Sequence, residues 1–71
     1  MTVDEWITAY AAALGIARPS DEDVEHLLDL AGIAAHASDR TAAPVSCWLA
    51  ARAGVEPSVA LALARDVAGD A

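Results

Sequence analysis

The sequence predicts an all-α domain, a compact bundle of four short helices. Apolar residues recur at spacings of three and four along most of the chain, which is the helical period. Residues typical of helix starts and ends divide the chain into four segments, and no stretch alternates apolar and polar residues for long enough to indicate a strand. Seventy-one residues make one domain, residues 1–71, and leave no room for a second.

The first helix is bounded by a capping box at its start and a glycine at its end. The Thr2 side chain can accept from the amide of Glu5, whose carboxylate can reach back to the amide of Thr2. Gly15 suits the left-handed position after the last turn. One face of this helix carries the apolar side chains, Val3, Trp6, Ile7, Tyr10 and Leu14.

The second helix begins after Ser20, a preferred N-cap residue, and the pattern breaks at Ser38. Gly32 lies in its middle, where it costs about 1 kcal/mol relative to alanine, and we interpret it as a close crossing with another helix. The expected buried stripe is Val24, Leu27, Leu28, Ala31, and Ala34 or Ala35. The early, outward part carries five acids, which we interpret as a solvated face or as an acidic docking face: Asp21, Glu22, Asp23, Glu25 and Asp29.

Proline marks the first turn of both remaining helices. Pro44 suits the first turn of the third, which Gly54 ends, and Pro57 restarts the chain for the fourth. The expected apolar face of the third helix is Val45, Trp48 and Leu49. The fourth carries apolar residues at four-residue spacing, Val59, Leu63 and Val67.

The material for a hydrophobic core is thin. Although 56% of the residues are hydrophobic, 19 are alanine, which contributes little apolar area. A domain this short buries only about 60% of its unfolded surface and usually needs further support. A disulfide within the chain is excluded because Cys47 is the single cysteine. We therefore expect a partner subunit or self-association, such as a homodimer.

The net charge of −7 comes from eleven acids against four arginines, with no lysine. This balance disfavours binding to nucleic acid or to an anionic membrane surface. The longest run without charge, residues 6–17, is shorter than the roughly 20 residues that span a bilayer. We see no secretory signal and expect a cytoplasmic location.

Scarce polar side chains gather at the joint between the second and third helices. Five of them are candidate partner- or anion-binding residues: His36, Arg40, Pro44, Ser46 and Trp48. Arg40, Ser46 and the free amides after Pro44 can together hold a phosphate or carboxylate at the start of the helix. The structural alternative is that Arg40 pairs with Asp39 or a carboxylate of the second helix, while His36 caps that helix.

Metal binding and catalysis have weaker support in the sequence. His26, Asp29, His36 and Cys47 include no paired metal-binding motif, so no metal site is expected. Cys47 near a helix start, with Arg40 nearby, can become a reactive thiolate with His36 as base. A free cysteine beside Trp48 is more often a small core residue, so we expect no catalytic residues.

Several stretches together resemble a known family: residues 4–7, 14–15, 28–31, 34–36, Arg40 and 42–44. They are similar to a small actinobacterial domain of unknown function, found alone or appended to a molybdopterin-guanine dinucleotide biosynthesis protein, the molybdenum cofactor guanylyltransferase. The resemblance covers about residues 3–54. It departs at residues 45–49, where the family's usual Leu-Thr-Thr-Phe-Leu is Val-Ser-Cys-Trp-Leu. Because the chain has no glycine-rich nucleotide loop, it is not itself the transferase.

The resemblance implies association with molybdenum-cofactor biosynthesis or with a molybdoenzyme such as a formate dehydrogenase, with no cofactor bound directly. The first hypothesis is therefore a non-enzymatic accessory or docking module on a larger protein of that pathway. The alternatives are a small carrier that binds an anionic or pterin-like ligand at the start of the third helix, and a self-associating structural module.

Overall fold

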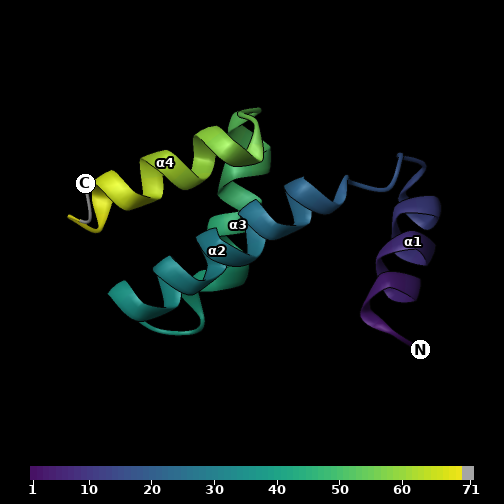
Figure 1. Cartoon of the computed structure of the whole chain (residues 1–71), viewed down its shortest axis with the longest axis horizontal. Coiled ribbons are helices and arrows are strands. Elements are labelled where there is room, and N and C mark those ends of the chain that lie inside the picture. Colours follow the sequence, from purple (N-terminus) through teal and green to yellow (C-terminus); the bar gives the residue numbers. More distant parts are fainter. Residues whose placement is uncertain (70–71) are drawn as a thin grey trace.

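The computed structural model describes residues 1–69 and contains four helices (Figure 1). They are α1 (Val3–Leu14), α2 (Asp21–Ala37), α3 (Ala42–Ala53) and α4 (Pro57–Val67). No strand occurs in these residues, so the predicted all-α helical bundle is confirmed. Asp70 and Ala71, which end the predicted domain 1–71, lie outside the described residues.

The helix ends follow the sequence signals closely. The capping box is present, with the Thr2 amide donating to Glu5 Oε1 at 2.9 Å and the Glu5 amide donating to Thr2 Oγ1 at 3.1 Å. Ser20 Oγ accepts from the Asp23 amide at 3.0 Å. Gly15 and Gly54 end α1 and α3 with φ of 75° and 74°, a left-handed conformation in which glycine avoids a side-chain clash.

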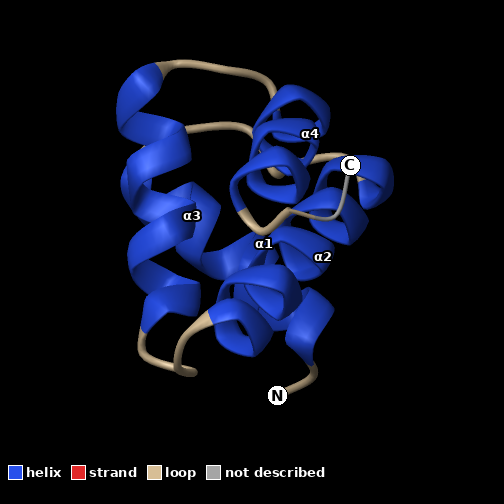
Figure 2. Cartoon of the chain, turned by 90° about the vertical axis from the view of Figure 1, so that its left-hand side faces the viewer, coloured by secondary structure: helices blue, strands red, loops and turns tan. Residues whose placement is uncertain are grey.

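The central helix of the bundle is α2. Both α3 and α4 pack on α2, and scarcely on each other. Seen from the side, α3 and α4 stand apart (Figure 2), and the short segment of residues 54–56 joins them. α1 is set beyond the amino-terminal end of α2 (Figure 1), and it makes no comparable contact with the other helices.

The core is as small as the alanine content indicates. It consists of Leu30 from α2 with Ala60 and Leu61 from α4, all at most 6% exposed. Partly buried side chains surround this cluster, namely Leu27, Ile33, Cys47, Ala50, Val55 and Ala64. On α1 the single buried residue is Ala11.

The buried faces of α2 and α4 differ from the expected ones. On α2, Leu28 is 66% exposed, whereas Leu30, which the predicted stripe omits, is 4% exposed. On α4, Val59, Leu63 and Val67 are all substantially exposed, and the inward residues are Ala60, Leu61 and Ala64. Because α2 packs on two helices at once, its buried arc is wider than one stripe and centres on Leu30.

Gly32 does not mark a close crossing. A Cβ atom built at this position would meet nothing within 4 Å. The interpretation of this glycine as a contact point between helices is therefore wrong, and the position is a weak point in the middle of α2.

Candidate interaction surfaces

The outer face of α3 exposes large apolar side chains. Val45, Trp48 and Leu49 were expected to form the inward face, but they are 57%, 61% and 56% exposed. The inward positions of α3 are instead occupied by smaller residues, Ala42, Ala43, Ser46, Cys47 and Ala50. At 100° per residue, Val45 and Trp48 lie nearly opposite the centre of that inward arc. α3 is thus apolar on two sides, which is typical of a helix covered by a further partner.

The five candidate joint residues do not form one site. Pro44 and Trp48 lie on the exposed side of α3. Ser46 is half-buried and lines a groove between α3 and α4. His36 lines a cleft between α2 and α4, and Arg40 is exposed in the turn between α2 and α3.

The start of α3 offers few free hydrogen-bond donors for an anion. The Ala42 amide donates to Asp39 O and the Ala43 amide to Arg40 O, at 2.9 and 3.1 Å. The Thr41 amide donates to Asp39 Oδ1 at 3.1 Å, and Pro44 has no N–H. These bonds engage the amides before Pro44. They do not involve the amides after Pro44, so the expectation that those amides help to hold an anion stays a prediction.

The structural alternative for this joint, in which Arg40 pairs with a carboxylate and His36 caps α2, is not observed. Within residues 1–69, Arg40 forms no ion pair with Asp39 or with a carboxylate of α2, since both ion pairs found there involve Arg18. The end of α2 is closed by Ser38, whose amide and hydroxyl both donate to Ala34 O. His36 does not act as the cap.

Four of the five acids of α2 share one exposed stripe. Asp21, Glu25 and Asp29 follow one another at four-residue spacing, and Glu22 adjoins them. Asp23 belongs to another side, where it is half-buried. The predicted acidic docking face is thus a stripe of four residues in this structure.

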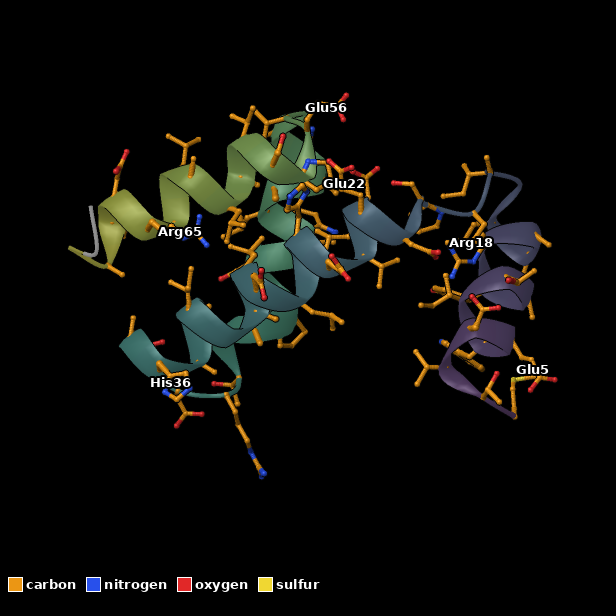
Figure 3. The ribbon with its side chains drawn as sticks, in the orientation of Figure 1. Glu5, Arg18, Glu22, His36, Glu56 and Arg65 are labelled. Carbon is orange, nitrogen blue, oxygen red and sulfur yellow. The ribbon has the colours of Figure 1, made fainter. Side chains whose placement is uncertain are left out.

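This stripe leads into a cleft between α2 and α4. The cleft measures about 640 Å³, and its polar lining residues are Asp29, His36 and Arg65. In Figure 3 the Arg65 side chain extends from α4 toward α2, and His36 lies near the end of α2. Arg65 could not be predicted as part of this cleft, because nothing in the sequence shows which side of α4 faces α2.

Cys47 packs against α2. Its Sγ lies 3.9 Å from the carbonyl oxygen of Leu27 on α2. Burial raises the pKa of the Cys47 thiol, contrary to the lowering expected for a reactive thiolate. His36 lies nine residues beyond Leu27, roughly 13 Å along the helix axis, so the proposed base is not beside the thiol.

The possible metal ligands are dispersed. No group of three or more His, Cys, Asp or Glu side chains in residues 1–69 could hold a metal ion. His26 Nδ1 is buried and has no hydrogen-bond partner there. Asp29 lies on the exposed stripe instead.

Arg18, in the segment between α1 and α2, was also missed by the sequence analysis. It pairs with Asp4 of α1 and, at 3.3 Å, with Asp21 of α2. Figure 3 shows its side chain turned toward α1. These two ion pairs link α1 to the start of α2. The apolar side of α1 faces solvent, including Trp6 at 58% and Tyr10 at 53% exposure.

The fold and these surfaces define a small all-α domain with unpartnered apolar helix faces. The chain belongs to a family described as a domain of unknown function, DUF6457, which matches residues 1–58. The match includes α1, α2 and α3 and the first two residues of α4. No curated protein and no solved structure matches the chain. Within residues 1–69, no helix combines the length and apolar character needed to cross a bilayer.

Proposed function

We propose that this domain is a non-enzymatic docking module that attaches to a larger protein through the outer face of α3. The observation that carries the proposal is the exposure of Val45 and Trp48 on the side of α3 opposite the core. Exposed apolar patches mark interaction sites, and tryptophan is strongly enriched among residues that dominate binding energy. Arg52 adjoins these residues one turn along and supplies a donor for a carboxylate at the rim.

The partner that we propose is a protein of the molybdenum-cofactor pathway or a molybdoenzyme such as a formate dehydrogenase. This choice rests on the resemblance described in the sequence analysis. A role as carrier of an anionic or pterin-like ligand at the start of α3 has less support, because Arg40 is exposed in the turn before α3 whereas Ser46 is half-buried and lines the groove.

The test is affinity purification of the tagged full chain from a host that expresses such proteins. Val45→Glu places a charge on the outer face of α3, and Val59→Glu makes the same change at a partly exposed position of α4. Wild type and Val59→Glu should recover a molybdoenzyme or cofactor-assembly protein at defined stoichiometry, and Val45→Glu should lose it. Equal recovery by all three variants, or recovery of no such protein by the wild type, would refute the proposal.

A further inference from the structure

An open apolar groove lies between α3 and α4, with α2 as its floor. Its volume is about 650 Å³. Leu30 and Ile33 line the floor, Leu49 one wall, and Leu63 and Val67 the other. The only polar residues in the lining are Ser38 and Ser46. Such a groove matches the apolar face of one more helix, which would complete the packing around α2.

α1 carries an apolar face of the kind that this groove lacks. Its exposed side presents Val3, Trp6, Tyr10 and Leu14, each more than half exposed. The Trp6 and Tyr10 rings are stacked, with centroids 5.7 Å apart and an interplanar angle of 14°. They therefore form one continuous aromatic surface. α1 and α3 both have 12 residues, or roughly 18 Å, so α1 can lie along the full length of the groove wall.

In this structure α1 is held away from the groove of its own chain. Arg18 ties α1 to the amino-terminal end of α2 through Asp4 and Asp21. The groove is lined by residues between Leu30 and Ser38, in the other half of α2. α1 therefore does not fill the groove of its own chain in this structure.

We propose that the groove between α3 and α4 receives α1 of a second copy of this chain, so that two copies exchange their first helices. A twofold axis makes the exchange reciprocal, and each α1 leaves its own groove free for the partner's helix. This inference goes beyond the proposed docking function, because it uses α1 and the groove, whereas docking uses Val45 and Trp48.

The buried area is sufficient for a stable dimer. With 150–250 Å² for each aromatic side chain, the exposed parts of Val3, Trp6, Tyr10 and Leu14 amount to roughly 400 Å². The groove contributes a smaller exposed area than the helix face, and the exchange docks two helices. The total is roughly 1,200 Å², the lower end of the range for specific protein–protein interfaces.

The first experiment measures the mass of the full chain in solution by light scattering over a dilution series. Wild type should have twice the 7.3 kDa mass of one chain. Tyr10→Glu on α1 and Leu63→Glu in the groove should each weaken the dimer by about a hundredfold or more, because each places a charge in an apolar contact. Thr8→Glu and Ala62→Glu, exposed positions of the same two helices outside this contact, should remain dimeric. A wild type that is monomeric throughout the series overturns the proposal.

Mixing the two defective variants tests the exchange itself. Tyr10→Glu retains a sound groove and Leu63→Glu a sound α1, so their mixture should form a heterodimer with one intact helix–groove contact. A dimer formed by two α1 helices face to face would instead survive Leu63→Glu and show no rescue, which would refute the exchange.

A spectroscopic measurement covers the case in which Leu63→Glu fails to fold. Trp48→Phe leaves Trp6 as the only tryptophan, and its emission should shift to shorter wavelength as the protein concentration rises. An unchanged emission maximum would contradict burial of Trp6 in the groove. Val45→Glu should stay dimeric while losing the larger partner, so failure of this inference is distinguishable from failure of the docking proposal.

Discussion

The contrast between Leu28 and Leu30 is the sharpest test of how this bundle is held together. The two leucines are two residues apart on α2, but Leu28 is 66% exposed and Leu30 is 4% exposed. Leu30 packs in the central cluster with Ala60 and Leu61. Replacement of each by alanine removes the same atoms from the same helix, so helix propensity and chemistry are matched and burial is the variable.

Leu30→Ala should cost about 3–4 kcal/mol, within the range for buried leucines, because α3 and α4 cannot both relax into the cavity. Leu28→Ala should cost about 0.5–1 kcal/mol, since only a third of its side chain is removed from water. A domain of this size has about 4–11 kcal/mol in total, so Leu30→Ala removes a large share. The difference between the variants corresponds to roughly 10–20 °C in Tm.

The measurement is urea and thermal unfolding of both variants and wild type, followed by circular dichroism. Protein concentration must be equal in all samples, because association raises apparent stability. If Leu28→Ala destabilises the protein as much as Leu30→Ala, the buried face of α2 is not the one described, and the assignment of the core is refuted.

Three further predictions concern the caps, the thiol and the glycines. Hydrogen bonds from the backbone amide of Thr2 and, to a smaller extent, from the Thr2 hydroxyl lower the pKa of Glu5. The stabilisation that the Glu5 carboxylate gives to α1 is therefore present above about pH 4 and is lost as the pH falls further. An acid titration of helix content should show this loss, and Glu5→Gln should remove the pH dependence of the cap. Burial raises the pKa of the Cys47 thiol in the folded protein. The free energy of unfolding should therefore decline as the pH rises above about 8.5, because the thiol ionises first in the unfolded chain. The same decline in the unfolding of a Cys47→Ser variant would contradict this assignment to Cys47. Gly32→Ala should stabilise the protein by up to about 1 kcal/mol, because the added Cβ meets open space. Gly54→Ala should destabilise it by about 1 kcal/mol, because Gly54 has a positive φ. Chemical denaturation of both variants measures the two changes in the free energy of unfolding.

Helix ends were predictable from this sequence because their chemistry is local. Thr2 with Glu5, Ser20, Gly15 and Gly54 each act within a few residues, and each occupies its expected place. The buried faces were not predictable to the same degree. Apolar residues cover more than half of the circumference of α3, so periodicity alone did not show whether Trp48 or Cys47 faces α2.

The predicted binding site at the joint between α2 and α3 could not be located from local patterns either. His36, Arg40, Pro44, Ser46 and Trp48 are close in sequence, but a turn and the helical period separate them. Ser46 and Trp48 are two residues apart, a rotation of about 200° about the helix axis, so they lie on nearly opposite sides of α3. Arg18 pairs with Asp4 of α1, and Arg65 lines a cleft together with residues of α2. In both cases the residues brought together are distant in sequence, and no local pattern signals that they meet.

The thin core connects the two proposed interactions. Only Ala11, Leu30, Ala60 and Leu61 are buried among the hydrophobic residues described, so much of the apolar surface that the sequence supplies remains available for association. Exchange of α1 covers the groove and docking covers Val45 and Trp48, and the two interactions use neighbouring sides of α3. A dimer would therefore present two outer α3 faces at a fixed separation. Binding to a partner that is itself dimeric would then gain from effective concentration, because the second contact becomes intramolecular. On this argument the same exposed leucines, valines and tryptophans that leave the isolated chain marginal are what make the assembled form stable and selective.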